Sequence, residues 1–240
     1  YDYWKKTSFS KKQWKELISF AKKKKISFLS SVFSLEAVDL LHGLGQKAFK
    51  IGSGEFFSKD ILDKIIKIKG SMIISTGMSN NLEIKNLVNY LQKKKAHFAI
   101  MQCTSSYPCD FSNVNLHMID YFKKHYKCSV GYSDHSGDII APILAINKNI
   151  TFLECHVKDG VNSTNPDLSS SISLKDLNFL SDYKKKFYDN QRKFEIKDKD
   201  KVAKLLHKNR ILFSKSLDLK KTKKKGKTII ATDLTMKKPG

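Results

Sequence analysis

Strand-like and helix-like segments alternate along this chain of 240 residues, and the alternation restricts the fold more than any other feature. Apolar runs that predict strands occupy residues 26–31, 48–53, 71–76, 98–104, 130–133 and 150–156. Apolar residues at helical spacing predict helices at residues 10–24, 35–44, 59–68, 82–94, 116–124, 139–146 and 174–187. This α/β pattern predicts a parallel sheet, either a closed barrel or an open doubly wound sheet.

Polar residues stand late in each predicted strand or just beyond it, from Ser31 in the first to His156 in the last. An open sheet collects its ligand contacts at a switch point between a few strands, whereas a barrel draws them from most strand ends. We therefore predict a (βα)8 TIM barrel. The sequence contains six strand units, so the first two units are expected upstream of Tyr1.

Three regions are expected along the chain: a partial barrel over residues 1–188, a linker over residues 189–209 and a small β-rich region over residues 210–240. Charged residues dominate the expected linker. Beyond it, residues 211–217 and 227–236 are expected to form short strands. The last region is too short for a core of its own, so we interpret it as the beginning of a domain.

The formal charge of +22 would ordinarily suggest a nucleic acid partner. Of the 45 basic residues, however, only Arg192 and Arg210 are arginines. Proteins that read bases use arginine forks, and proteins that stack bases combine aromatic with basic residues, and neither pattern occurs here. We therefore do not expect nucleic acid as the main partner, and expect instead that the charge favours small anionic substrates.

Nothing in the sequence predicts a membrane span or a secretion signal, because it has no apolar run of about 18 residues and no apolar core near Tyr1. Its four cysteines form no CxxC pair. We expect a cytoplasmic protein in a reducing compartment, with no membrane partner.

His135 and His156 each stand where a predicted strand ends. Two neutral imidazoles with water ligands suit an open site for a borderline divalent ion. Alternatively, each histidine is only a hydrogen-bonded residue at the mouth of the barrel. The two residues alone leave both interpretations open.

Lys50 stands late in its strand and precedes the segment Gly52–Gly54. A lysine beside backbone donors that a ligand can approach closely suits a phosphate or carboxylate. Alternatively, the lysine extends into solvent and the glycines only form a turn. If the barrel closes, serine hydroxyls would converge near this lysine from Ser31, Ser53, Ser75, Ser105 and Ser133.

Five motifs stand at the strand ends: KIGSGE (50–55), STGM (75–78), QCTSSYP (102–108), GYSDHSG (131–137) and LECHV (153–157). In order and spacing they resemble the sialic acid synthase family, which includes N-acetylneuraminate, legionaminic and pseudaminic acid synthases. The stretches FLSSVFSLEAVDLL (28–41) and LFSKSL (212–217) resemble it too, so the resemblance covers nearly the whole chain.

The resemblance implies condensation of phosphoenolpyruvate with an N-acetylated amino sugar such as N-acetylmannosamine, giving a nine-carbon 2-keto sugar acid and phosphate. It implies a divalent metal, manganese or alternatively magnesium or cobalt, which His135 and His156 hold and which polarises the sugar aldehyde. The implied phosphoenolpyruvate contacts are Ser31, Lys50, Ser53, Ser75, Ser105 and Ser133, and the implied sugar contacts are Glu55, Tyr107 and Asp167. The implied catalytic residues are Lys50, Glu55 and the two histidines.

The resemblance also implies that residues 210–240 begin an antifreeze-like (SAF) domain, and that the full-length protein is a domain-swapped homodimer. Two departures from the family pattern occur: Asn165 precedes Pro166 and Asp167 where the family often has glycine, and Ser105 stands where some members have asparagine. Two alternatives to the enzyme remain, a non-catalytic remnant or paralogue of such a synthase and a basic protein that binds polyanions.

Overall fold

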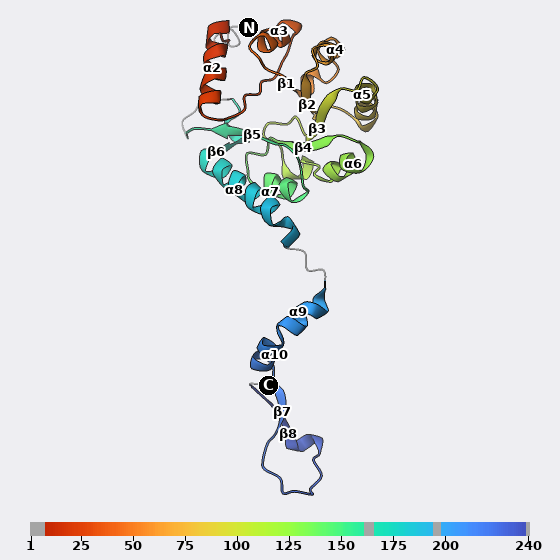
Figure 1. Cartoon of the computed structure of the whole chain (residues 1–240), viewed down its shortest axis with the longest axis vertical. Coiled ribbons are helices and arrows are strands. Elements are labelled where there is room, and N and C mark those ends of the chain that lie inside the picture. Colours follow the sequence, from red (N-terminus) through yellow and green to blue (C-terminus); the bar gives the residue numbers. More distant parts are fainter. Residues whose placement is uncertain (1–7, 161–165, 194–197, 239–240) are drawn as a thin grey trace. The chain divides into compact units, whose positions relative to one another are not determined.

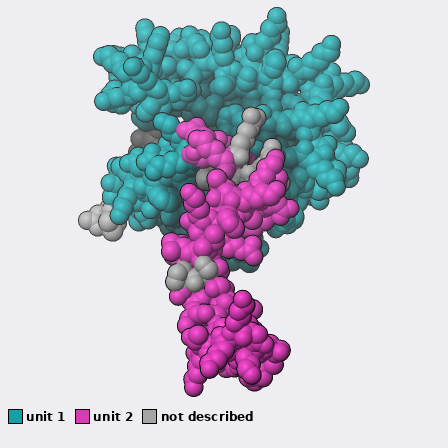
Figure 2. Space-filling view, turned by 60° about the horizontal axis from the view of Figure 1, so that its bottom comes forward, with its two compact units in different colours: residues 1–187 teal, residues 188–240 magenta. Residues whose placement is uncertain are grey.

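The computed structural model describes residues 8–160, 166–193 and 198–238. The chain divides into two compact units, Tyr1–Phe187 and Tyr188–Gly240, which are coloured separately in Figure 2. Among the described residues, no helix is both long and apolar enough to cross a membrane.

The first unit is built on a six-stranded parallel sheet in which consecutive strands are neighbours. Its strands are β1 (Ala48–Ile51), β2 (Ser71–Ser75), β3 (His97–Cys103), β4 (Ser129–Asp134), β5 (Leu153–Lys158) and β6 (Ser171–Ser173). The sheet curls, and helices lie around its outer side, as in part of a (βα)8 barrel (Figure 1).

The helices of this unit are α2 (Lys11–Lys23), α3 (Leu35–Gly43), α4 (Lys59–Lys67), α5 (Asn81–Lys93), α6 (His117–His125), α7 (Ile140–Asn147) and α8 (Leu174–Asn190). The unit also contains the short 3-10 turns η1 (Ser53–Glu55), η2 (Phe111–Asn113) and η3 (Leu168–Ser170). Helix α8 continues past the boundary at Phe187, and η4 (Gln191–Lys193) follows it in the second unit. All seven predicted helices are confirmed, with ends shifted by at most three residues. The capping box of Ser10 and Gln13 before α2 is present.

The core lies between the sheet and its helices. Phe49 and Ile51 of β1 and Ile100 of β3 are completely buried, and they belong to one cluster with Val38 of α3 and Leu91 of α5. Strand side chains alternate between the two faces, so these apolar residues face the helices and the residues between them face the interior of the barrel.

One predicted strand is absent and one observed strand was not predicted. Residues 26–31 form no strand, because only Ser31 makes a ladder contact, a single parallel bridge to Lys50. The structure adds β6 instead, which pairs with β5 beginning at His156 and Ser171. Three residues of the sequence Ser-Ile-Ser carry too little apolar signal for a strand prediction.

The second unit contains α9 (Lys199–Leu205), α10 (His207–Phe213) and an antiparallel pair, β7 (Ser216–Leu219) and β8 (Leu234–Lys237), preceded by η5 (Ala231–Asp233). The predicted linker over residues 189–209 therefore contains helix, and the predicted strand at residues 211–217 is helix over its first half. Asp198 begins α9 by accepting hydrogen bonds from the N–H groups of Asp200 and Lys201. Both helices are short and exposed, so they lack the apolar periodicity on which the predictions rest.

Candidate active site

Strand register brings the polar strand ends to one face of the sheet. Partners in parallel strands share a face, and so do residues two apart in one strand. The aligned pairs are Ser31 with Lys50, Cys103 with Ser133, and Ser133 with Glu154. His135 and His156 each stand two residues beyond Ser133 and Glu154, and therefore project from the same face.

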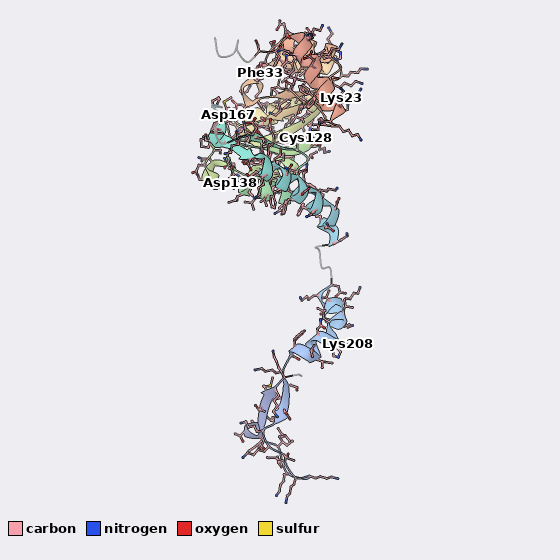
Figure 3. The ribbon with its side chains drawn as sticks, turned by 90° about the vertical axis from the view of Figure 1, so that its left-hand side faces the viewer. Lys23, Phe33, Cys128, Asp138, Asp167 and Lys208 are labelled. Carbon is pink, nitrogen blue, oxygen red and sulfur yellow. The ribbon has the colours of Figure 1, made fainter. Side chains whose placement is uncertain are left out.

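The carboxyl ends of the strands all lie on one side of the unit. Figure 3 shows Phe33, Asp138 and Asp167, which follow strand ends, on this side, and Lys23 and Cys128, which precede strand segments, on the opposite side. In barrel enzymes, active sites are built at the carboxyl ends of the strands.

A cavity of about 490 Å³ opens among these strand ends, within the usual size range of a small-molecule site. Its lining includes the predicted residues Ser31, Lys50, Ser53, Ser75, Ser105, Tyr107, Ser133, His135 and His156. The five predicted serines and Lys50 thus line one cavity.

Lys50 is the buried cation of this cavity. Its Nζ donates a hydrogen bond of 2.8 Å to Ser75 Oγ and forms an ion pair with Glu154 Oε2 at 3.2 Å. An ammonium group has three N–H donors. Among the described residues, the bond to Ser75 uses one of these donors, whereas Glu154 Oε2 is an ion-pair partner that accepts no hydrogen bond, so donors remain for an anion in the cavity.

The two histidines lie side by side, with ring centroids 5.1 Å apart. His135 Nδ1 is 2.8 Å from the carbonyl oxygen of Thr104, which can only accept, so Nδ1 carries the proton and the lone pair is on Nε2. His156 Nδ1 is 3.5 Å from the carboxylate of Asp167. Each ring therefore has its Nε2 available as a ligand atom.

Burial, followed by the neighbouring His135, lowers the pKa of His156. A lowered pKa keeps this imidazole neutral at pH 7, the form that binds metals. The ring of Tyr107 packs 4.2 Å from His135 and 5.7 Å from His156 between centroids. Burial raises the pKa of Tyr107, so its phenol remains a hydrogen-bond donor.

Asp134 fixes the segment that carries His135. Its buried carboxylate accepts hydrogen bonds from the Tyr132 hydroxyl at 2.8 Å and from the N–H and hydroxyl of Ser136 at 3.1 and 2.9 Å. The carbonyl of His135 accepts a further bond of 2.8 Å from the N–H of Cys109. Burial raises the pKa of Asp134.

Two predicted carboxylates do not line the cavity. Glu55 lies in η1 and accepts a hydrogen bond from the Ser58 hydroxyl. Asp167 precedes η3, and its carboxylate contacts His156, which lines the cavity. Among the described residues, no three or more His, Cys, Asp or Glu side chains are grouped so as to hold a metal ion.

Sequence reasoning did not assign Glu154 or Cys103 to the site, although both line the cavity. The sequence could have predicted Glu154, because Glu154 stands two residues before His156 in one strand and must lie on the same face as His156. Cys103 lies 3.9 Å from both Ser53 Oγ and His135 Nδ1. Burial raises the pKa of the Cys103 thiol, so the thiol stays neutral.

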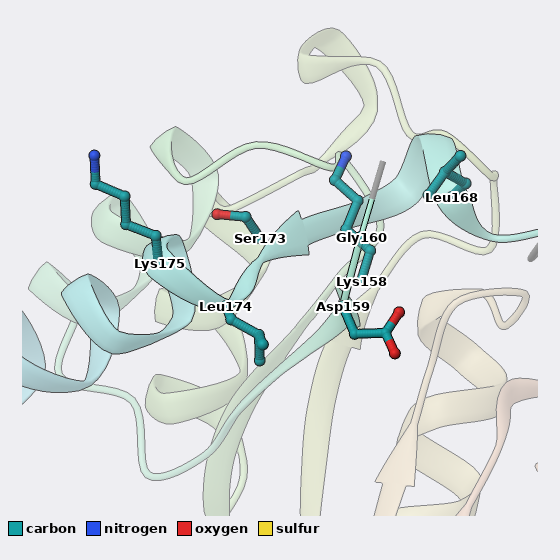
Figure 4. A pocket seen from close by; sticks show the side chains of 7 residues that line it. All are labelled: Lys158, Asp159, Gly160, Leu168, Ser173, Leu174 and Lys175. Carbon is teal, nitrogen blue, oxygen red and sulfur yellow. The ribbon is translucent and has the colours of Figure 1, made fainter. Parts of the chain in front are cut away.

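A separate hollow of about 430 Å³ lies at the ends of β5 and β6 (Figure 4). It is lined by Lys158, Asp159, Gly160, Leu168, Ser173, Leu174 and Lys175, and by none of the predicted site residues. The predicted residues therefore belong to a different cavity.

The sequence profile of the NeuB family matches residues 1–194, well over half of the chain. The chain belongs to the NeuB family. The predicted resemblance to sialic acid synthases is thereby confirmed.

This NeuB-family chain is 38% identical over 228 residues to the N,N'-diacetyllegionaminic acid synthase of Campylobacter jejuni, a match that covers 94% of this chain and 67% of that protein. It is 33% identical over 150 residues to the N-acetylneuraminate-9-phosphate synthase of Homo sapiens, covering 62% of this chain and 42% of that protein. Both relatives are named as synthases, and the matched region spans 67% of the first and 42% of the second.

Among solved structures, the N-acetylneuraminic acid synthetase of Leptospira borgpetersenii, crystallised with citrate, matches with a TM-score of 0.77 and 26% identity. The match covers 84% of this chain and 71% of that one. The prediction that the first unit is part of a (βα)8 barrel is confirmed.

Proposed function

We propose that this NeuB-family protein condenses phosphoenolpyruvate with an N-acetylated amino sugar to give a nine-carbon 2-keto sugar acid and phosphate. The methylene carbon of phosphoenolpyruvate forms a bond to the aldehyde carbon of the sugar. Water adds at the carbon that bears the phosphate, and phosphate leaves with cleavage of its carbon–oxygen bond.

The observation that carries this proposal is the convergence of one buried lysine, five serines and two histidines in a single cavity at the carboxyl ends of the strands. Phosphoenolpyruvate carries a phosphate and a carboxylate. A lysine and neutral hydroxyl donors match such an anion without adding groups that titrate near pH 7.

Lys50 would pair with the anion through a remaining donor, beside its contacts to Ser75 and Glu154. The hydroxyls of Ser31, Ser53, Ser105 and Ser133 would donate to the phosphate and carboxylate oxygens. Fixing these donors before the substrate arrives reduces the reorganisation needed as charge develops in the reaction.

The two histidines fit a divalent metal. Two imidazoles that bind one ion through nitrogens about 2.1 Å away would have ring centroids roughly 4.6 to 5.4 Å apart. The observed separation of 5.1 Å lies in this range. We propose that His135 and His156 hold manganese, or alternatively magnesium or cobalt, through Nε2; when bound, such an ion supplies Lewis-acid polarisation of the aldehyde oxygen.

The sugar would be contacted by Tyr107, beside the histidines, and by Asp167, which lies against His156. Glu55 would reach the sugar only after turning away from Ser58. We further propose that residues 210–240 begin an antifreeze-like domain and that the protein acts as a domain-swapped homodimer.

The test is phosphate release by the whole chain from phosphoenolpyruvate and N-acetylmannosamine, or from a di-N-acetylated six-carbon sugar, with and without Mn²⁺. We expect release that needs manganese, and a loss of about 10²-fold or more in kcat/KM for Lys50→Ala, comparable with the removal of one charged contact to a transition state. His135→Ala and His156→Ala should each remove manganese binding as measured by calorimetry.

His42→Ala is the matched control, because His42 is an exposed residue at the end of α3. It should bind manganese and turn over as the wild type does. Unchanged manganese affinity in both His135→Ala and His156→Ala would refute the metal site. A folded wild-type chain that releases no phosphate under any of these conditions would favour the non-catalytic paralogue.

A further inference from the structure

Gly77 lies in the wall between the candidate site and a neighbouring cavity. The segment that follows β2 alternates between the two: Ser75 and Met78 line the site, while Gly77 lines a second cavity of about 400 Å³. Cys103 lines both cavities. Because glycine has no side chain, Gly77 contributes only backbone atoms to the boundary between the two cavities.

The backbone of Gly77 forms hydrogen bonds with Ser53 and Ser105, two of the predicted contacts of the substrate anion. Its N–H donates to Ser53 Oγ at 3.0 Å, and its carbonyl accepts from the N–H of Ser105 at 3.3 Å. Ser53 follows β1 and Ser105 follows β3, the two strands that flank β2. Gly77, which follows β2, therefore connects the loops that follow β1 and β3.

A side chain at Gly77 would force neighbouring side chains to move. A Cβ placed there would lie 2.4 Å from Ser105 Oγ, 2.8 Å from Ser53 Oγ and 2.9 Å from Cys103 Sγ. The φ of Gly77 lies outside the left-handed region, so glycine is favoured here by the close approach of these side chains and not by backbone conformation. Ordinary contact with a methyl group would need Ser105 Oγ to withdraw by about 1 Å.

We propose that Gly77 is a positioning residue that sets the places of the Ser53 and Ser105 hydroxyls and thereby the affinity of the site for phosphoenolpyruvate. The inference rests on the proposed function and deepens it. Displacement of binding groups by about 1 Å can cost 10²-fold in rate. A methyl group at this position acts on two anion contacts together and leaves Lys50 and both histidines chemically intact.

The experiment compares Gly77→Ala with wild type in the whole chain. Calorimetry measures the Kd of phosphoenolpyruvate, and steady-state phosphate release measures KM for each substrate. We expect the Kd and KM of phosphoenolpyruvate to rise at least tenfold and the KM of the amino sugar to change by less than twofold. Gly43→Ala is the control, because Gly43 ends α3 with nothing within 4 Å of an added Cβ.

A second variant separates positioning from a general folding defect. Ser105→Ala removes the atom closest to the added methyl group, so Gly77→Ala should cost less affinity in the Ser105→Ala background than alone. If Gly77→Ala melts early, the double variant should recover melting temperature.

Wild-type affinity for phosphoenolpyruvate in Gly77→Ala, or strictly additive effects in the double variant, would overturn this inference alone. Failure of the wild-type chain to bind phosphoenolpyruvate would overturn both this inference and the proposed function.

Discussion

At the scale of single residues, the candidate site combines charged and neutral groups whose states are set by their surroundings. Lys50 is held between Ser75 and Glu154, and His135 has its tautomer set by the Thr104 carbonyl. His156 is kept neutral chiefly by burial. The neutral state of His156 affects the stability of the folded chain, which can be measured without substrate.

The lowered pKa of His156 predicts a loss of stability in mild acid. The unfolded chain takes up a proton at this histidine near its ordinary pKa of about 6.5, whereas the folded chain resists it. The stabilising contribution is therefore complete above about pH 6.5 and declines as the pH falls toward the folded-state pKa. Urea unfolding between pH 7.5 and 5.5 should show a steeper decline for wild type than for His156→Gln. Parallel curves would contradict the prediction.

At the scale of elements, α5 begins where two side chains form hydrogen bonds with backbone N–H groups of its first turn. The Asn80 side chain accepts hydrogen bonds of 3.0 Å from the N–H groups of both Leu82 and Glu83, and the Glu83 carboxylate accepts one of 2.7 Å from the N–H of Asn80. This capping box begins α5 three residues after Gly77. The same cap therefore stabilises α5 and holds the end of the segment between β2 and α5 that carries Gly77.

Asn80→Ala should lower the free energy of unfolding by about 1 kcal/mol, because it removes both bonds accepted by the cap. Asn89→Ala in the same helix is the matched control, because Asn89 is exposed and alanine favours a helix interior. Urea denaturation of the two variants measures the difference. Equal stability of the two would show that the cap contributes nothing.

At the scale of the whole molecule, the fully buried side chains among the described residues lie in the first unit. Ile100 lies at 0% exposure in β3, between β2 and β4. No described side chain between residues 198 and 238 is buried. The cooperative core of the chain is therefore the sheet and its helices.

Ile100→Ala should lower the free energy of unfolding by about 2–5 kcal/mol, because it opens a cavity in a packed core. Ile211→Ala, in the exposed helix α10, should change it by at most about 0.5 kcal/mol. Chemical denaturation followed by circular dichroism compares them. A larger loss for the α10 variant would mean that burial is not concentrated in the first unit.

Helical periodicity, strand-length apolar runs and caps are local properties, so the sequence by itself determined the seven helices of the first unit, four of its strands and part of a fifth, and the (βα)8 class. It also located the strand ends and therefore the predicted cavity residues, since the carboxyl ends of parallel strands share one edge. Residues 26–31 have an apolar run but form no strand, because their ladder contact is limited to the bridge between Ser31 and Lys50. The linker expected at residues 189–209 overlaps α9 and part of α10, because short capped helices leave little apolar pattern.

Only the tertiary structure decided which of these side chains meet. Lys50 and Glu154 are 104 positions apart and pair at 3.2 Å, and the space around Gly77 is defined by residues of the strands on either side. Strand register and sheet curvature arise from the packing of all the helices against the sheet. No local pattern in the chain encodes the distances that result.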